Sequence, residues 1–212
     1  MKQLARSLPS NFSPELPMQY PLTLTFKLWS LAPQLALQDA TGDNTVFCIR
    51  QKLFKLKEVI NVFADLQRTQ LKYEIKADRI IDFSARYNFV DTNGKTMGAV
   101  KRRGMKSLWR AHYDIYDGDT AIFTISEQNP WVKVMDSLFA EIPIVGLFTG
   151  YVFNPVYAVN RANGNPVMYL EKRPAFLSRI FTIKQVDQLS GNEEAQVLLS
   201  LVMMLLLERN RG

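Results

Sequence analysis

The segment 195-AQVLLSLVMMLLL-207 is the strongest indication of the fold, because thirteen consecutive residues carry no charge and only two of them are polar. Glu193 and Glu194 precede it, where negative charge stabilises the start of a helix, and Asn192 is the predicted N-cap. The pattern predicts a helix over about 193–208. A bilayer span needs roughly 20 apolar residues, so the segment is typical of a core helix. A helix that is apolar on every side must be covered on every side.

Alternating apolar and polar residues fill the chain before this helix. The alternation is clearest in 71–76, 81–89 and 109–115, and glycine-containing turns such as Asp91–Gly94 separate these segments. Many short strands with such turns predict a mainly β fold. A closed barrel covers the whole helix with the inward faces of its strands, and closure also removes exposed sheet edges. We therefore expect a closed antiparallel barrel wrapped around the helix.

A weak internal repeat agrees with this architecture. Residues 87–115 and 157–183 align at an offset of seventy residues on a shared Asn-Gly pair. Each copy contains a strand, a turn, a second strand, a basic pair and a third strand, and an earlier copy is expected over 39–62. The alternative interpretation is coincidental turn chemistry.

Composition and charge exclude several classes of protein. With 47% hydrophobic and 22% charged residues the chain is neither disordered nor fibrous. One cysteine and one histidine exclude an internal disulfide and a Cys/His zinc cluster. The 26 Lys and Arg residues exceed the 20 Asp and Glu residues, and the net charge of +6 favours acidic partners such as anionic lipid, phosphorylated ligands or nucleic acid.

Two segments differ from the predicted barrel. Residues 1–21 are rich in proline, lack the apolar core of a signal peptide, and are expected to form a flexible arm before a barrel domain at 22–212. Residues 142–153 carry no charge and follow an expected amphipathic helix at about 130–141. This uncharged stretch is expected either in the core or at a membrane interface. The protein is expected in the cytoplasm, where it can associate with a membrane surface as a peripheral protein.

The sequence offers little for catalysis. Cys48 lies in an apolar strand and is expected to be an inert core thiol, while His112 falls on the polar face of its strand. No phosphate-binding glycine loop is present. Asp114, Asp117 and Asp119 surround a turn. The cluster has two interpretations, a weak Ca²⁺ contact or an acidic turn without a ligand, and the second is favoured. We expect no enzyme, no metal site and no cofactor beyond this weak Ca²⁺ possibility.

Three groups of basic residues follow equivalent strands of the repeat and are expected to share one rim of the barrel. Near an anionic membrane each such residue contributes on the order of 1 kcal/mol. The alternative is a solvated face that keeps the protein soluble. The groups are Lys101, Arg102, Arg103, Lys106 and Arg110; Arg50, Lys52, Lys55 and Lys57; and Lys172, Arg173 and Arg179.

These features together resemble the tubby C-terminal-like superfamily, and within it the LURP-one-related and phospholipid-scramblase-like proteins. The resemblance rests on the unit 87–100 with its Asp-Thr-Asn-Gly turn, the segment 101–115, the second copy at 157–183 and the helix ending in Glu208. It implies a twelve-stranded antiparallel barrel around a central hydrophobic C-terminal helix. It also implies phosphoinositide binding through basic residues, as in tubby-like members, or Ca²⁺-responsive lipid movement, as in scramblase-like members.

Two departures weaken the scramblase alternative. The segment 185–192 contains one carboxylate, Asp187, where the scramblase-like Ca²⁺ segment is richer in acids, and Cys48 stands alone where a cysteine-rich palmitoylation stretch is implied. We therefore expect a non-enzymatic, membrane-associated module that binds anionic phospholipid or phosphoinositide headgroups. The alternatives are a scramblase-like lipid transfer protein and a soluble regulatory scaffold with a protein partner, and nucleic acid is the least favoured ligand. The predicted headgroup site comprises Lys101, Arg102, Arg103, Lys106 and Arg110, supported by Lys172 and Arg173.

Overall fold

The computed structural model describes residues 18–27, 34–50, 59–79, 85–104, 111–128, 155–174 and 178–209. This part of the chain forms twelve β-strands and one α-helix. The strands are β1 (Leu22–Lys27), β2 (Gln34–Gln38), β3 (Thr45–Arg50), β4 (Val59–Phe63), β5 (Leu71–Ala77), β6 (Arg86–Asp91), β7 (Thr96–Arg102), β8 (His112–Asp117), β9 (Thr120–Glu127), β10 (Val156–Arg161), β11 (Pro166–Arg173) and β12 (Ser178–Gln185), and the helix is α2 (Gly191–Arg209).

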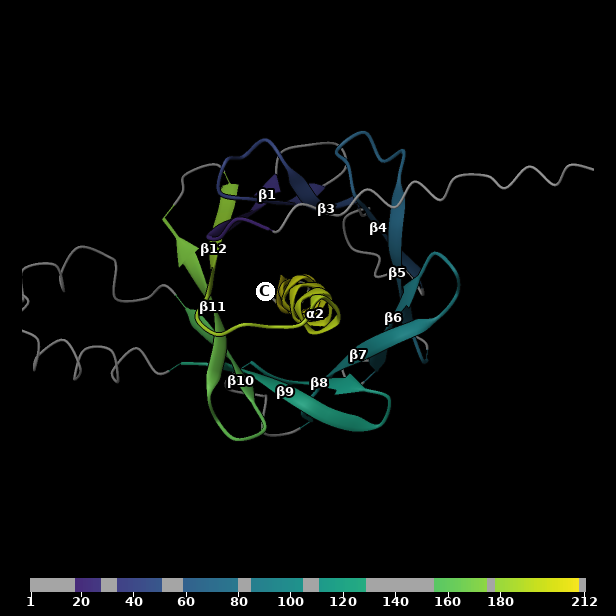
Figure 1. Cartoon of the computed structure of the whole chain (residues 1–212), viewed down its shortest axis with the longest axis vertical. Helices are drawn as coiled ribbons and strands as arrows, with labels where there is room; N and C mark the ends of the chain where they lie inside the picture. Colours follow the sequence, from purple (N-terminus) through teal and green to yellow (C-terminus); the bar gives the residue numbers. More distant parts are fainter. Residues whose placement is uncertain are drawn as a thin grey trace, which may run out of the picture.

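The strands form a closed antiparallel barrel. Each strand pairs with its neighbours in sequence, and β1 pairs with both β2 and β12, which closes the sheet (Figure 1). The register places Leu24 opposite Leu37 on one side and opposite Phe181 on the other. The predicted mainly β class and the closed barrel are confirmed.

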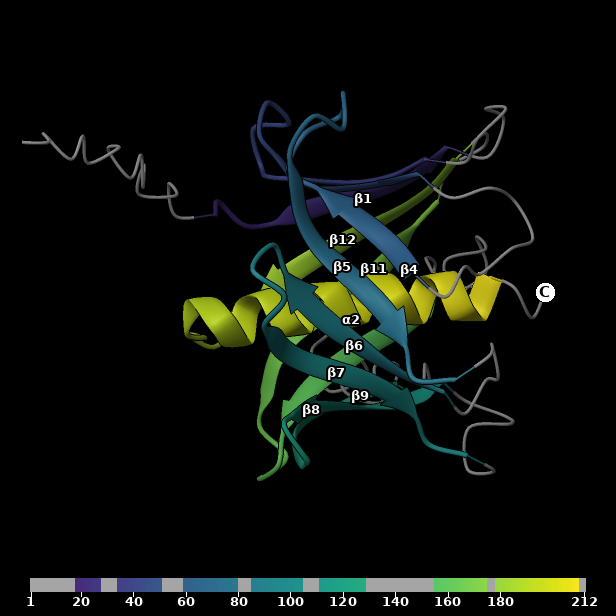
Figure 2. The same cartoon turned by 90° about the vertical axis from the view of Figure 1, so that its right-hand side faces the viewer.

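Helix α2 runs through the centre of this barrel (Figures 1 and 2). All residues from Ala195 to Leu207 are buried, including the polar Gln196 and Ser200. They pack against inward strand residues such as Phe89 and Ile115, which belong to the same hydrophobic core. The all-round apolar sequence therefore has the all-round cover that it requires.

The start of the helix differs from the predicted N-cap. The Glu193 backbone N–H donates to Ser190 Oγ at 3.3 Å, and the Ser190 N–H donates to Glu193 Oε2 at 2.9 Å. This reciprocal pair is a capping box, so Ser190 is the N-cap in place of Asn192. The prediction missed it because the Ser-x-x-Glu spacing begins two residues before Asn192.

A polar contact joins the buried part of the helix to the barrel wall. The Gln196 side-chain amide donates to the backbone carbonyl of Met97 on β7, and Ser200 Oγ donates to the Gln196 carbonyl at 2.7 Å. Gly98 makes this approach possible, since a Cβ there would lie 2.8 Å from both Gln196 Nε2 and the backbone oxygen of Tyr116.

Three hairpins spaced four strands apart, β2–β3, β6–β7 and β10–β11, agree with the predicted repeat, although the first hairpin begins with β2, before the expected start of the first copy at residue 39. In each turn a glycine N–H donates to the carbonyl of the residue three positions earlier, at 2.9–3.1 Å, and the glycine has a positive φ. A break in register recurs in each hairpin just before this turn. The turn glycines are Gly42, Gly94 and Gly164, and the breaks lie at Leu37/Gln38, Phe89/Val90 and Val159/Asn160.

The end of the predicted N-terminal arm is part of the packed structure. Met18 and Tyr20 lie against the hydrophobic core, and the Tyr20 hydroxyl donates to Glu194 Oε1 at 2.7 Å. The Gln19 carbonyl accepts a hydrogen bond from Ala40 at 3.0 Å. The boundary expected at residue 21 therefore moves to before residue 18, because an aromatic side chain is anchored there. Residues 1–17, and the segments 130–141 and 142–153, lie outside the described residues.

Candidate functional site

The barrel has two ends of different character. Because neighbouring strands alternate in direction, the five connections that join β2–β3, β4–β5, β6–β7, β8–β9 and β10–β11 all lie where α2 begins. We call this end the N-terminal mouth. Strands β3, β7 and β11 finish at the opposite end, where α2 also finishes, and we call that end the C-terminal mouth (Figure 2).

Charged groups at the N-terminal mouth are tied to one another. Arg161 contacts Asp187 at 3.2 Å and Glu193 at 3.3 Å, and donates to the Gln188 carbonyl at 2.8 Å. The Arg161 guanidinium also lies over the Phe123 ring. Hydrogen bonding from Ser190, together with the charge of Arg161, lowers the pKa of Glu193. This network holds the first turn of α2 against the barrel.

At the C-terminal mouth, Arg102 points into the barrel. Its side chain is only 7% exposed and lies 3.7 Å from Glu208 at the end of α2. The Tyr113 hydroxyl donates to the same carboxylate at 2.6 Å, and the Arg102 guanidinium faces the Tyr113 ring. A cation at a helix C-terminus also interacts favourably with the helix dipole. Arg102 therefore anchors the last turn of α2 and is not available to an external ligand.

The neighbours of Arg102 lie on the outer face of the barrel, because strand residues alternate between the two faces. Lys101 is opposite Asp114 in register but forms no ion pair within 4 Å in the described part of the chain. Arg103 donates to Asp114 Oδ2 at 2.7 Å, and this hydrogen bond raises the pKa of Arg103. The predicted cluster is thus divided between the inside and the outside of the wall.

The basic group that contains Lys172 and Arg173 is divided in the same way. Lys172 occupies the repeat position equivalent to Arg102, seventy residues later, and lines a pocket inside the mouth. Arg173 lies on the outer face, where it donates to Thr182 Oγ1 at 2.9 Å. Lys106 and Arg110 lie outside the described residues, as do Lys52, Lys55 and Lys57.

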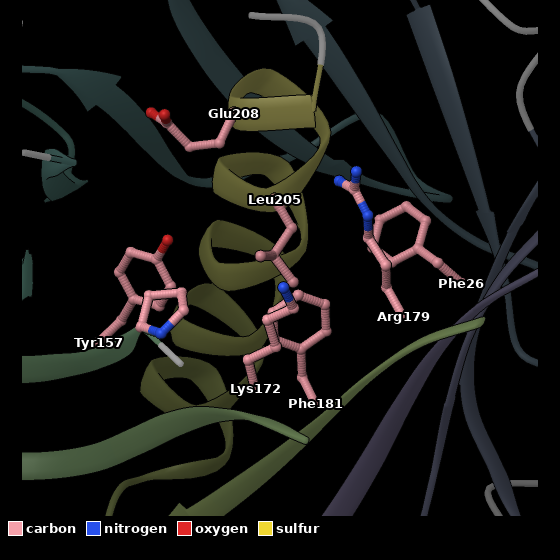
Figure 3. A pocket seen from close by; sticks show the side chains of 8 residues that line it. Phe26, Tyr157, Lys172, Arg179, Phe181, Leu205 and Glu208 are labelled. Carbon is pink, nitrogen blue, oxygen red and sulfur yellow. The ribbon is translucent and has the colours of Figure 1, made fainter. Parts of the chain in front are cut away.

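The pocket at the C-terminal mouth lies between α2 and the wall formed by β10, β11, β12 and β1, and has a volume of about 130 Å³. Figure 3 shows Lys172, Phe181, Arg179 and Phe26 on the strand side, and Leu205 and Glu208 on the helix side. Lys172 is opposite Phe181 in register and Arg179 is opposite Phe26, so each cation is next to an aromatic ring. The remaining lining residues are Pro155 and Tyr157.

Lys172 and Arg179 are the unpaired cations of this pocket. Among the described residues, neither has a carboxylate within 4 Å, although Glu208 lines the same pocket. Glu208 is instead engaged by Arg102 and Tyr113. The pocket therefore presents two positive charges beside an apolar floor.

Tyr157 adds a hydroxyl group to the pocket. Burial, followed by the negative charges of Glu127 and Glu208, raises the pKa of Tyr157. The phenol therefore stays protonated at neutral pH and remains a hydrogen-bond donor.

Lys172 is the one lining residue of this pocket that the predicted site contains, and the hydrogen-bond donors Arg179 and Tyr157 were not part of that site. Arg179 alternates with Phe181 and Ile183, both inward, so the period of two in β12 already indicated its direction. Tyr157 carried no comparable signal, because its role depends on Glu208, which is 51 positions further along the chain.

Other expected groups have structural surroundings. Cys48 is fully buried on β3 and accepts a hydrogen bond from Gln34 at 3.3 Å, which confirms it as a core thiol. Asp114 bonds to Arg103, and in the described segments no three His, Cys, Asp or Glu side chains gather into a possible metal site. None of the described helices combines the length and the apolar character needed to cross a membrane.

Comparison with known families gives one match. The profile of the LURP-one-related family matches residues 45–141, which include the strands from β3 to β9. Searches of curated proteins and of solved structures gave no match. The family match covers a little less than half of the chain, and together with the closed twelve-strand barrel around a helix it confirms the predicted resemblance to the LURP-one-related proteins and their tubby-like fold.

Proposed function

We propose that this protein is a non-catalytic module that binds anionic phospholipid headgroups with its C-terminal mouth. The observation that carries the proposal is the presence of three cations without an acidic partner within 4 Å among the described residues. These cations are Lys101 on the outer face and Lys172 and Arg179 inside the mouth. Cations without a close carboxylate keep their charge for an external ligand, although Lys101 also helps to lower the pKa of Asp78. Arg102 and Arg103, in contrast, each lie within 4 Å of a carboxylate.

The opposite end of the barrel has the opposite charge, which supports a preferred orientation. The turns and strand ends of the N-terminal mouth carry mostly acids, and its few cations include Arg161, which is fully engaged. An anionic membrane attracts one end of such a molecule and repels the other. The acids are Asp39, Asp43, Asp65, Asp91, Asp117, Asp119 and Asp187.

The test is co-sedimentation of the protein with neutral and with anionic vesicles. We expect binding to anionic vesicles only, with loss of binding at high salt because screening weakens exposed charges. The triple variant Lys101→Met, Lys172→Met and Arg179→Met should lose most of this binding. Methionine keeps the side-chain length at the lysine positions while it removes the charge.

The matched control removes the same number of cations from elsewhere. Arg68→Met, Lys95→Met and Lys184→Met give the same net charge but change the turns of the N-terminal mouth and the outer wall. This control should bind like the wild type. Equal loss in both triple variants would show that net charge alone matters, and would contradict a site at the C-terminal mouth.

Two additions to the vesicle experiment distinguish the headgroup proposal from a scramblase-like function and from a soluble scaffold. Each vesicle experiment is repeated with and without Ca²⁺, and lipid exchange between the leaflets is measured in parallel. Ca²⁺-stimulated exchange would favour the scramblase-like function over the present proposal. A monodisperse protein that ignores all vesicles would overturn the proposal and direct the search toward a protein partner.

A further inference from the structure

The pocket at the C-terminal mouth combines features that a diffuse basic surface lacks. It is recessed beside the last turns of α2, and both its cations are next to aromatic rings (Figure 3). We infer that this pocket binds one phosphate monoester that carries a short apolar group. The inference deepens the headgroup proposal and rests on it only for the case in which the ligand is a lipid.

The charge of the pocket fits a phosphate monoester. Such a group carries about −1.5 to −2 charges at pH 7 and offers three acceptor oxygens. Lys172 and Arg179 supply two positive charges without acidic partners among the described residues. The planar guanidinium donates two parallel hydrogen bonds to a phosphate, and the ammonium acts as a compact point charge. The protonated Tyr157 hydroxyl is a further donor on the same lining.

Glu208 limits how much negative charge the pocket accepts. Its carboxylate is held on the lining by Tyr113 and Arg102. A second phosphate on the ligand would face this fixed negative charge, and like charges at close range cost free energy. The pocket therefore favours one phosphate over a polyphosphorylated headgroup.

The floor of the pocket fits a small apolar group. Phe26, Phe181, Leu205 and Pro155 provide carbon surface beside the two cations. Sites for drug-sized ligands have volumes of roughly 300–1,000 Å³, whereas this cavity measures about 130 Å³. It accommodates the phosphate end of a molecule and the first carbons after it, and a full acyl chain must lie outside.

A ligand in this pocket touches both the helix and the wall. Leu205 and Glu208 are three residues apart on one face of α2, while Lys172 and Arg179 belong to β11 and β12. The site exists only when the helix is docked, so the ligand binds the folded state alone. Binding must therefore raise the thermal stability of the protein.

The experiment uses n-butyl phosphate, a water-soluble monoester, in calorimetric titration and thermal unfolding of the full chain. We expect saturable 1:1 binding, at least tenfold tighter than that of inorganic phosphate, dibutyl phosphate or inositol trisphosphate. Lys172→Met and Arg179→Met should each weaken binding at least tenfold and remove the rise in Tm. Lys184→Met is the matched control, because this lysine lies on the outer wall in an ion pair with Glu171 and should leave binding unchanged.

Two outcomes would overturn the inference. The first is butyl phosphate binding no tighter than inorganic phosphate, which would remove the role of the apolar floor. The second is wild-type affinity in both methionine variants with circular dichroism spectra like that of the wild type, which would place the binding elsewhere.

Vesicles that contain phosphatidate, a monoester lipid, or phosphatidylglycerol, a diester lipid, identify the source of the ligand. Tighter binding to phosphatidate at equal surface charge supports a lipid ligand in the pocket. Butyl phosphate binding without vesicle binding supports the pocket with a free phosphate monoester, and overturns the headgroup proposal. Vesicle binding without butyl phosphate binding overturns the pocket inference and leaves the headgroup proposal standing.

Discussion

The two mouths of the barrel solve the same problem in different ways. Each must hold one end of a buried helix, and each does so with an arginine facing a glutamate, namely Arg161 with Glu193 and Arg102 with Glu208. At the N-terminal mouth the arginine is surrounded by acceptors. At the C-terminal mouth two further cations remain without an acidic partner among the described residues, beside a pocket. The charged groups of the N-terminal mouth therefore stabilise the fold, whereas the C-terminal mouth also has cations that are available to a ligand.

The repeat explains why the C-terminal mouth has cations without an acidic partner among the described residues. Arg102 and Lys172 occupy equivalent positions in two copies, and both point inward. The helix they face has no matching symmetry, and Glu208 is engaged on the side of Arg102 and Tyr113. A threefold-related wall around a single helix must therefore leave equivalent side chains in different surroundings.

The largest expected effect concerns the space around the helix. Gly98→Ala should lower the free energy of unfolding by about 2–3 kcal/mol, since a Cβ would meet the Tyr116 backbone oxygen at 2.8 Å and overpacking is costly. The control is Gly104→Ala beyond the other end of β7, where a Cβ meets nothing within 4 Å. Urea unfolding measures both, and equal stability of the two variants would contradict tight docking near the N-terminal mouth.

A second pair of substitutions tests the difference in charge pairing. Arg161→Met should destabilise the protein by about 1–2 kcal/mol, because it leaves the Gln188 carbonyl and two carboxylates without their partner. Lys172→Met should change stability by less than about 0.5 kcal/mol. The comparison fails if the lysine variant is the more destabilised of the two in thermal and urea unfolding.

Two tyrosines offer a smaller and cleaner comparison. Tyr20→Phe removes a 2.7 Å hydrogen bond to Glu194 and should cost about 1 kcal/mol. Tyr157 makes no hydrogen bond to a described residue, and Tyr157→Phe should be close to neutral for stability while it weakens butyl phosphate binding. Similar losses of unfolding free energy in the two variants would refute the distinction.

The smallest expected effect depends on pH. The pKa of Glu193 is lowered mainly by hydrogen bonding from Ser190, so its contribution to stability is present above the ordinary glutamate pKa and is lost as pH falls through the lowered value. Glu193→Gln keeps the capping box but removes the charge. Wild type and variant should differ by about 0.5 kcal/mol at pH 7 and converge once the pH falls below the lowered pKa of Glu193. A constant difference across this range of unfolding experiments would contradict the charge effect.

Most of the architecture was predictable from local patterns. The uncharged run before Glu208 required burial on all sides, and alternation with glycine turns supplied strands to cover it. The recurring turns at Gly42, Gly94 and Gly164 indicated the spacing of the hairpins. The capping box is equally local, because the Ser-x-x-Glu spacing from Ser190 to Glu193 is visible in the sequence.

The site was less predictable, because the basic residues were grouped by their proximity in sequence. Lys101, Arg102 and Arg103 are consecutive, but strand alternation sends Arg102 inside and its neighbours outside. Arg179 is in the same predicted basic group as Lys172 but was not part of the predicted site, although it shares the pocket with Lys172 from a different strand. The period of two within each strand, applied to the cations, indicates the correct grouping.

Hydrophobic periodicity along neighbouring residues is enough to show that a helix must be buried and that strands must close around it. Which cations face a carboxylate and which remain available depends on the packing of distant segments. Arg102 is neutralised because the fold brings it to Glu208, and Tyr113 meets the same carboxylate across 95 positions of sequence. Such pairing depends on distances between distant segments, and no local pattern encodes those distances.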